Sequence, residues 1–307
     1  MKALINRGEG EVAVDLTEVP APEPGPSDAV VGVEAVAVNR GELRLLGVRP
    51  HGWRPGQDVA GVVMTAAADG SGPAEGTRVV AWPEQEGWAE QVAVPTTHLA
   101  PLASNVSFAQ GATLPIAGLT ALRVLRLGGD LSGRRVLVTG AAGGVGRFAV
   151  ELAAGAGADV TGVAASPERA AGLEDLGAAA VVQEIAEAQG PFDLILESAG
   201  GASLEASIHL VAPGGTVAVY GNSSNTSAQV SFGDFRGRAG ARIVAFFVYE
   251  SGEPPTFGED LKTLADMVAE GSLHPQIGLE APWTEANTVF AALAGREVNG
   301  KAVLLVG

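Results

Sequence analysis

The chain has 307 residues, enough for about two domains of roughly 150 residues each, and 47% of its residues are hydrophobic, which is enough to fill folded cores. The formal net charge of −16 makes nucleic acids and anionic membranes poor partners, so we expect neither. The absence of cysteine excludes disulfides, thiol nucleophiles and thiolate-bound zinc.

The N-terminal residues lack the apolar core of a secretory signal peptide. No apolar run along the sequence reaches the 18 or so residues that a membrane-spanning helix needs. We therefore expect a cytoplasmic protein.

Short apolar strands alternate with turns rich in proline and glycine in the first third of the chain. The pattern predicts strands at residues 2–6, 11–19, 28–39, 58–65, 77–82 and 87–94. Closely spaced short strands with such turns are typical of an antiparallel barrel or sandwich.

Strands and helices alternate after residue 115. A helix is predicted at 116–127, strands at 135–139, 159–164, 179–182, 193–198, 216–220 and 241–249, and helices between them at 147–156, 167–176, 185–188 and 204–211. The tail adds helices at 261–270 and 285–294 and a strand at 301–306. The alternation indicates an α/β fold with a doubly wound parallel sheet, whose strands are apolar on both faces.

A glycine-rich turn follows the first strand of this series. The sequence from Arg135 to Gly146 contains Ala141-x-Gly143-x-x-Gly146 directly before a predicted helix. Small residues at these positions let a pyrophosphate approach the free N–H groups at the start of the helix. This context favours a dinucleotide-binding turn, and the alternative is a tight strand-to-helix turn that binds no ligand.

The end of the second strand bears on the choice between NADH and NADPH. An NAD enzyme usually has an acidic residue there, whereas this chain has Ser166, which lies 20 residues after Gly146 (166 − 146 = 20). Arg169 follows closely and suits a ribose 2′-phosphate, so we favour NADPH. Ser166 before Pro167 is also an ordinary helix N-cap, and both roles are compatible.

Four further phrases, Ala37–Glu42, Pro55–Gly61, Gly118–Ala121 and Gly300–Leu304, stand in a characteristic order around the glycine turn. Together they resemble the medium-chain dehydrogenase/reductase superfamily, and within it the zinc-independent quinone oxidoreductase (zeta-crystallin-like) branch. The resemblance covers the whole chain. It implies a GroES-like β-barrel catalytic domain of residues 1–115 and 250–307 and an NADP-binding Rossmann domain of residues 116–249, with the cofactor between them.

The resemblance also implies which residues approach the cofactor and how two copies of the chain associate. Relatives often form homodimers along the last Rossmann strand, here about 243–249. Gly143–Gly146 would bind the pyrophosphate, and Ser166 and Arg169 the adenosine phosphate. The full set of implied NADPH-binding residues is Asn39, Thr120, Gly143, Gly144, Val145, Gly146, Ala165, Ser166, Arg169, Gly221, Asn222, Phe247, Val248 and Lys301.

The catalytic candidates by this resemblance are Asn39, Glu42 and Arg44, and two of them depart from the branch. Glu42 stands where relatives usually carry aspartate, and Arg44 where several carry tyrosine, so no tyrosine proton donor is available in the catalytic domain. Arg44 would steer a carbonyl or acidic substrate, or would simply be a solvated surface arginine. Gln57-Asp58 stands where zinc-dependent relatives carry a His-Glu pair, and the four histidines are scattered, so we expect no metal.

The expected reaction is hydride transfer from NADPH to a small-molecule quinone or α,β-unsaturated carbonyl. A quinone needs no strong protein acid, because water protonates its reduced oxygens, whereas an enone leaves an enolate oxygen that needs a donor such as Asn39. The alternatives are an enoyl or 2-alkenal reductase of the same superfamily, or a protein that binds NADPH without catalysis.

Overall fold

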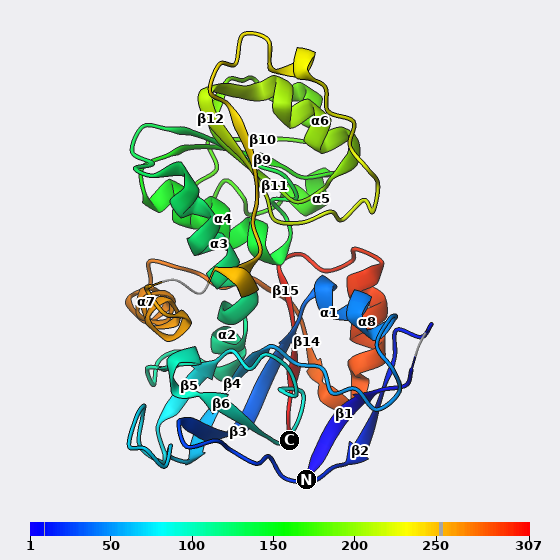
Figure 1. Ribbon diagram of the computed structural model, residues 1–307, viewed down its shortest axis with the longest axis vertical. Coiled ribbons are helices and arrows are strands. Elements are labelled where there is room, and N and C mark those ends of the chain that lie inside the picture. Colours follow the sequence, from blue (N-terminus) through cyan, green and yellow to red (C-terminus); the bar gives the residue numbers. More distant parts are fainter. Residues whose placement is uncertain (9, 252–253) are drawn as a thin grey trace. The chain divides into compact units, whose positions relative to one another are not determined.

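The computed structural model describes residues 1–8, 10–251 and 254–307. Contacts within the chain divide it into two units (Figure 1). The β-rich unit comprises Met1–Leu119 and the C-terminal segment that ends at Gly307, and the Rossmann unit comprises Thr120–Ser251. Each unit has its own sheet and core.

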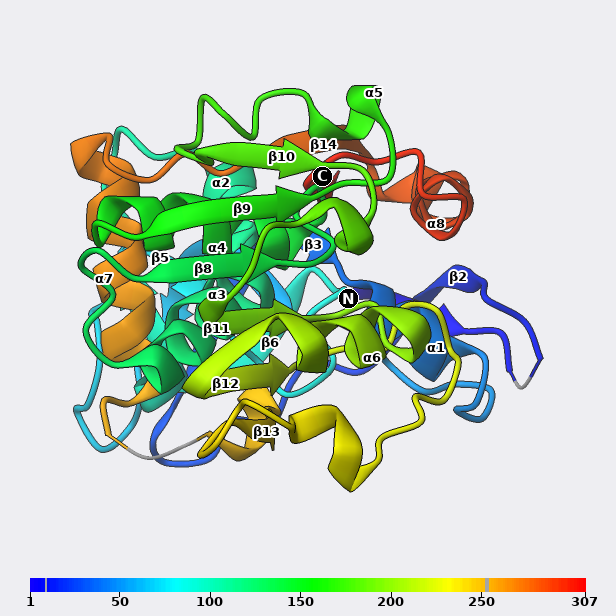
Figure 2. The ribbon, with the colours of Figure 1, turned by 90° about the horizontal axis from the view of Figure 1, so that it is seen from above.

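A six-stranded parallel sheet forms the centre of the Rossmann unit. Its strand order is β10-β9-β8-β11-β12-β13 (Figure 2). From β8, the chain first adds β9 and β10 on one side of the sheet and then adds β11, β12 and β13 on the other side. Because the middle strands are buried on both faces, their sequences are continuous apolar runs, as in Leu194–Leu196. The strands are β8 (Arg135–Val138), β9 (Asp159–Val163), β10 (Ala180–Val182), β11 (Phe192–Glu197), β12 (Val211–Val219) and β13 (Arg242–Ala245).

Helices cover both faces of this sheet, and Figure 2 shows α4 and α6 on opposite sides of it. The helices are α3 (Leu119–Leu125, in this unit from Thr120), α4 (Gly144–Gly155), α5 (Pro167–Ala170) and α6 (Gly201–Leu210). Short 3₁₀ turns lie at Arg126–Gly128, Ile185–Glu187, Phe232–Phe235 and Val248–Glu250. The arrangement follows from right-handed crossovers that run outward in both directions from the centre of the sheet.

Several sequence-based predictions in this unit are wrong in extent, among them a helix and a strand. The helix expected at 167–176 ends after Ala170, because Gly172 adopts a φ of +79°, which lies outside the helical region. The strand expected at 241–249 ends at Ala245, and a 3₁₀ turn follows it. The first difference leaves the crossover from β9 to β10 without a full covering helix.

The β-rich unit contains a mostly antiparallel seven-stranded sheet and a separate β1–β2 hairpin. The order is β14-β15-β3-β4-β5-β7, with β6 paired to β3, and β14–β15 is the parallel pair among these described strands. The strands are β1 (Lys2–Asn6), β2 (Val14–Glu18), β3 (Asp28–Val38), β4 (Asp58–Thr65), β5 (Arg78–Ala81), β6 (Gln91–Pro95), β7 (Leu99–Pro101), β14 (Ile277–Pro282) and β15 (Lys301–Leu305). The sequence patterns did not predict β7, which is only three residues long, or β14.

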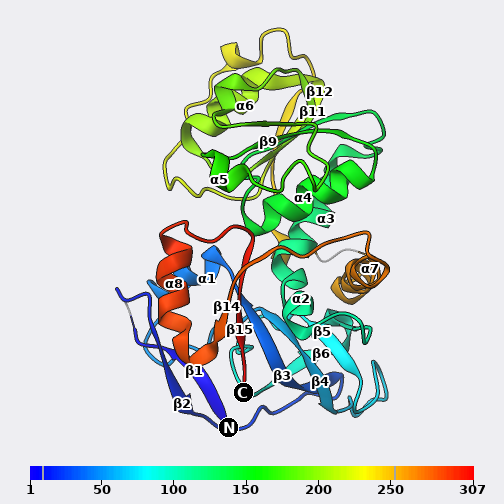
Figure 3. The same cartoon turned by 180° about the vertical axis from the view of Figure 1, so that it is seen from behind.

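The helices of the β-rich unit close its core. Figure 3 shows α8 beside β14 and α1, where Phe290 of α8 packs against Trp88 with ring centroids 5.2 Å apart. The helices are α1 (Arg40–Leu46), α2 (Phe108–Ala112), α7 (Phe257–Glu270) and α8 (Ala286–Ala294), with a π-helical turn at Leu114–Gly118 and 3₁₀ turns at Thr96–His98 and Trp283–Glu285. In the described residues, the structure has no helix with the length and apolar character that a membrane crossing requires.

The fold class predicted from the sequence is confirmed: a six-stranded parallel Rossmann sheet and a separate, mostly antiparallel domain.

Candidate functional site

A buried polar cluster lies where three neighbouring strands of the β-rich unit meet. Strand β15 pairs with β3, so that Ala302 lies opposite Val38, and β3 pairs with β4, so that Ala37 lies opposite Asp58. This register brings together Lys301 at the start of β15, Asn39 just after β3 and Asp58 at the start of β4. The Nζ of Lys301 donates to Oδ2 of Asp58 over 2.7 Å and to Oδ1 of Asn39 over 2.6 Å.

The fourth member of this cluster is Glu42, in the first turn of α1. Its Oε2 accepts from the backbone N–H of Asn39 over 2.9 Å, and its Oε1 accepts from the backbone N–H of Gln57 over 3.0 Å. Burial raises the pKa of Glu42 to about 8, and the nearby carboxylate of Asp58 adds to this rise. The hydrogen bonds from Asn39 and the charge of Lys301 oppose the rise. Glu42 therefore holds a proton at neutral pH in most molecules.

Asn39 is the half-buried member of the cluster, and its amide orientation is fixed from both sides. Its Nδ2 donates to Asp58 Oδ2 over 2.9 Å and to Glu42 Oε2 over 3.1 Å, while its Oδ1 accepts from Lys301. Both hydrogens of this amide are thereby engaged within the cluster. The second carboxylate oxygen of Asp58, Oδ1, accepts a hydrogen bond from the backbone N–H of Ile116.

The structure therefore brings together two of the three predicted catalytic candidates, Asn39 and Glu42, with the predicted cofactor residue Lys301. The third candidate, Arg44, is exposed on the same helix. Sequence reasoning did not select Asp58, although the sequence contained a signal for it. An acidic residue at the start of a strongly apolar strand lies either at the surface or in the interior with a partner. Here it is fully buried and paired.

The glycine turn of the Rossmann unit starts at the carboxyl end of β8 and opens α4. Gly140 adopts a φ of +62°, which favours glycine, and Gly143 is the N-cap of α4 without a side-chain cap. A Cβ on Gly146 would lie 2.4 Å from the carbonyl oxygen of Gly140, so only glycine lets the helix approach the turn this closely. The first-turn amides of Gly144, Val145 and Gly146 have no partner within the helix.

This turn lies at the topological switch point of the sheet, between β8 and β11, where the strand order changes direction. Ser198, which follows β11, donates from its N–H to Thr139 Oγ1 over 2.9 Å and from its Oγ to the carbonyl of Thr139 over 3.1 Å. A Cβ on Gly221 would lie 3.3 Å from the Ser198 Cβ. Ligands of doubly wound sheets bind at such a switch point. The uncapped amides and the space kept by glycines fit the pyrophosphate of a dinucleotide.

One carboxylate at the carboxyl end of β11 has a structural role. Glu197, the last residue of β11, is fully buried and accepts from the backbone N–H groups of Ala199 and Gly200 over 2.6 and 2.7 Å. Its other oxygen accepts from Ser203 over 2.8 Å and from Ser207 over 3.2 Å. The charge of Glu197 therefore anchors the N-terminus of α6.

The residues expected at the adenosine end lie together after β9. Ser166 caps α5, and its Oγ accepts from the backbone N–H of Arg169 over 3.4 Å. Ala165 is exposed, and Ser166 and Arg169 are half-buried. A hydroxyl and a guanidinium are groups that bind phosphate, and both belong to this short helix and its cap. The Ser166 side chain also hydrogen-bonds to the carboxyl group of Glu168, and this bond lowers the pKa of Glu168.

The remaining predicted cofactor residues differ in how far they are exposed. Thr120 and Val248 are buried, with exposed fractions of 6% and 5%, whereas 58% of Phe247 is exposed. Asn222 is exposed, and its side chain bonds to Ser224 and Thr226 within its own loop.

Comparison with protein families identifies the chain. Residues 144–269 match the family model described as zinc-binding dehydrogenase. The solved structure of the quinone oxidoreductase from Coxiella burnetii superposes with a TM-score of 0.86 and 25% identity, over 100% of this chain and 99% of that one. The chain belongs to the medium-chain dehydrogenase/reductase superfamily, in its quinone oxidoreductase-like branch.

Curated relatives are longer than this chain. The spectinabilin polyketide synthase system protein NorB of Streptomyces orinoci is 32% identical over 96% of the chain, which spans only 14% of that protein. The 2-methylene-furan-3-one reductase of Solanum lycopersicum is 31% identical over 81% of the chain, which corresponds to 63% of the relative. A mycobacterial protein solved with NADPH shares the fold, with a TM-score of 0.89 and 22% identity over 99% of this chain and 100% of that one.

The family description names zinc, but the donor set for it is missing here. The sequence has no cysteine, and in residues 1–8, 10–251 and 254–307 no three histidine or carboxylate side chains are grouped so that they could hold a metal ion. At the position of the His-Glu pair of zinc-dependent relatives, Gln57 and Asp58 instead bond to neighbouring groups of the chain.

Proposed function

We propose that this protein is an NADPH-dependent oxidoreductase that transfers a hydride to a quinone or an α,β-unsaturated carbonyl compound without zinc. The observation that carries the proposal is the turn from Gly140 to Gly146, whose uncapped amides lie at the switch point of a Rossmann sheet. Two relatives whose names state a quinone oxidoreductase and a furanone reductase support the class of acceptor.

The residues that would hold the cofactor divide into two groups by chemistry. The amides of Gly144, Val145 and Gly146 would bind the pyrophosphate, and Gly143, whose own N–H donates to the Gly140 carbonyl over 3.0 Å, would leave room for it. Ser166 and Arg169 would bind the 2′-phosphate. We propose that Ala165, Thr120, Gly221, Asn222, Phe247 and Val248 contact the rest of the nucleotide, and Asn39 and Lys301 its reacting end. The bound cofactor supplies the hydride, and the chain supplies position and exclusion of water.

The buried cluster favours a quinone as the acceptor. Reduction of an enone leaves an enolate oxygen, which needs a hydrogen-bond donor, but both amide hydrogens of Asn39 are already bound to Asp58 and Glu42. A quinone needs no such donor, because solvent protonates its reduced oxygens. The cluster instead holds the Asn39 amide in one orientation, which suits a positioning role.

An alkene reductase is the second candidate, and the names of the furanone reductase and of a 2-haloacrylate reductase of the same fold support it. The test is NADPH oxidation at 340 nm with 1,4-benzoquinone, phenanthrenequinone and a 2-alkenal, each against an enzyme-free control. We expect quinone-dependent oxidation that exceeds oxidation with the alkenal, and a lower rate with NADH than with NADPH.

Oxidation with the alkenal alone would contradict the preference for a quinone and would identify an alkene reductase. Tight NADPH binding without oxidation by any acceptor would overturn the proposal and would identify a protein that binds the cofactor without catalysis.

We also propose that two copies of the chain associate along β13. This strand pairs only with β12 among the described strands, so its outer edge is free. Exposed apolar residues lie on or just after it: Ile243, Phe247 and Tyr249. A free edge flanked by apolar side chains favours pairing with a second copy around a two-fold axis.

A further inference from the structure

Arg147 is a buried cation in the first turn of α4, directly after the last glycine of the turn. Only 5% of it is exposed. Its guanidinium donates to three backbone carbonyls: Ala142 over 3.3 Å, Arg169 over 3.3 Å and Ala171 over 2.9 Å. In the part of the chain that the structure describes, these carbonyls are its hydrogen-bond partners, and no carboxylate forms an ion pair with it.

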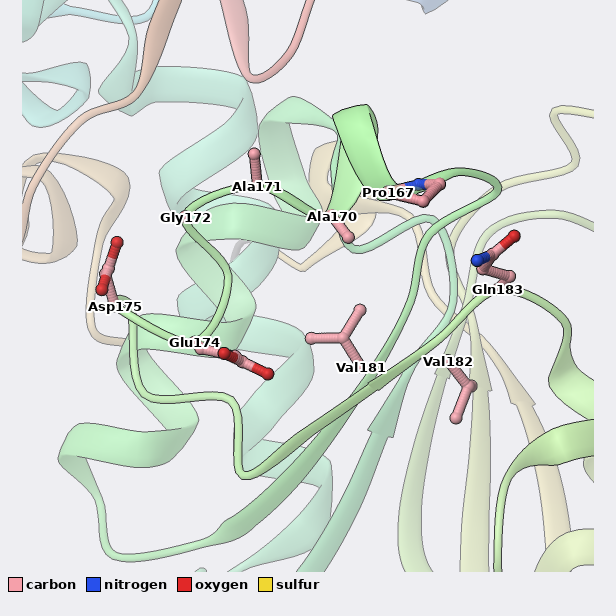
Figure 4. Close-up of a pocket in the computed structure, with 9 residues that line it drawn as sticks. All are labelled: Pro167, Ala170, Ala171, Gly172, Glu174, Asp175, Val181, Val182 and Gln183. Carbon is pink, nitrogen blue, oxygen red and sulfur yellow. The ribbon is translucent and has the colours of Figure 1, made fainter.

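These three bonds join the glycine turn to the segment after α5. That segment lacks the helical turns that the sequence predicts, and it passes over a pocket of about 370 Å³ in front of β10. Figure 4 shows Ala170 and Val181 facing each other across this space. Leu173 and Leu176 anchor the later part of this segment in the core, with exposed fractions of 0% and 8%. The bonds from the Arg147 guanidinium to the carbonyls of Arg169 and Ala171 hold the first residues of the segment.

The backbone at Gly172 leaves room for the guanidinium of Arg147. Gly172 has a φ of +79°, and a Cβ there would lie 3.5 Å from Nη1 of Arg147. The turn at Gly172 thus directs the carbonyls of Arg169 and Ala171 toward the guanidinium. The position of Arg169 depends on this arrangement, because the guanidinium of Arg147 donates to the backbone carbonyl oxygen of Arg169.

The charges add a second effect. Burial and the neighbouring charge of Arg169 lower the pKa of Arg147, although an arginine remains charged. The Arg147 guanidinium is thus a buried charge whose described hydrogen-bond partners are neutral carbonyls. A cation buried in this way is stabilised by an anion brought to its vicinity.

We infer that Arg147 is a specificity-determining positioning residue: it holds the 169–171 segment so that Arg169 and Ser166 face a ribose 2′-phosphate, and its buried charge favours that dianion. The inference rests on the proposed function, since it assigns how the same site selects its cofactor. A phosphomonoester carries about −1.5 to −2 charges at neutral pH, whereas the 2′-hydroxyl of NADH carries none. Arg147 therefore acts on NADPH much more than on NADH.

The test is the dissociation constant of NADPH and of NADH, measured by titration calorimetry for wild type, Arg147→Gln, Arg147→Lys and Arg169→Ala. We expect Arg147→Gln to weaken NADPH about tenfold or more and NADH less than about threefold. Arg147→Lys keeps the charge but loses the fork, so it should lie between wild type and Arg147→Gln. Arg134→Gln, an exposed arginine paired with Asp193, is the matched control and should change neither constant.

A second readout reports the support given to the segment. Amide hydrogen exchange in residues 169–176 should be faster in Arg147→Gln than in wild type without any ligand, and unchanged in Arg134→Gln. Equal weakening of NADPH and NADH, or no change in either, would overturn the inference. If wild type binds neither nucleotide, the proposed function itself fails. That result is distinct from equal weakening of the two nucleotides and from unchanged affinities, because it is seen in wild type.

Discussion

Glu42 shares its buried cluster with a second carboxyl group, that of Asp58, and with one ammonium group, that of Lys301. With both carboxyl groups ionised the three side chains would carry a net charge of −1, and with Glu42 protonated they are neutral. Because isolated charge is costly in a buried site, neutrality accounts for the raised pKa of Glu42. We therefore expect Glu42 to bind a proton in the folded chain at a higher pH than in the unfolded chain.

This proton predicts how stability depends on pH. The pKa of Glu42 is about 8 in the folded chain against an ordinary value of 4.5, so between these values the folded state binds a proton that the unfolded state does not. Its contribution to stability is complete below about pH 4.5 and is lost as the pH rises through 8. The slope is on the order of 1 kcal/mol per pH unit over this interval.

We therefore expect Glu42→Gln to flatten the fall in unfolding free energy between about pH 5 and 8, as measured by urea denaturation. Glutamine also replaces one acceptor oxygen by an NH₂ group, so absolute stability should drop at every pH, and the slope is the informative quantity. Glu34→Gln, at an exposed position of β3, is the control and should keep the wild-type slope. Equal slopes in wild type and Glu42→Gln would contradict this account.

At the scale of elements, local signals were predictable and pairing register was not. The glycine turn before α4 is visible in the sequence because its strand, turn and helix are contiguous. Lys301 and Asp58 are separated by 243 positions in the chain, and only the register of β15 on β3 and of β3 on β4 brings them together. The sequence patterns contain no information on this register.

Large apolar side chains are exposed on strand β13 and just after it. The exposed fraction of Ile243 is 38%, and those of Phe247 and Tyr249 are 58% and 49%. A second copy that pairs with this edge would bury these side chains. Ile243→Lys would place a charge in the contact, so we expect it to weaken dimerisation by about tenfold or more.

Light scattering after size exclusion, over a range of concentrations, measures this effect directly. Wild type should have twice the mass of one chain, and Val48→Lys, at a position that is 64% exposed in the β-rich unit, should keep that mass. A wild-type monomer at micromolar concentration, or equal dissociation of both variants, would rule out the β13 interface.

At the scale of the whole molecule, the alternation of strands and helices was sufficient to predict the fold, because a parallel sheet and an antiparallel domain impose different periods and different apolar runs. The same reasoning placed a helix at 167–176, where Gly172 ends it after one turn. It also passed over Arg147, although a lone arginine beside apolar residues of α4 was a signal that its charge is held by the fold.

We propose that the amides of Gly144, Val145 and Gly146 bind the pyrophosphate of NADPH. The most direct test is a calorimetric NADPH titration of wild type and Gly143→Val. Gly143 has φ −82° and ψ 175°, which valine can adopt, and its Cβ would lie 3.3 Å from the Gly140 carbonyl oxygen, so the side chain mainly fills the space before the amides. We predict a folded variant that has lost NADPH binding by at least about a hundredfold. Unchanged affinity in Gly143→Val would show that the turn is only a tight connection between β8 and α4.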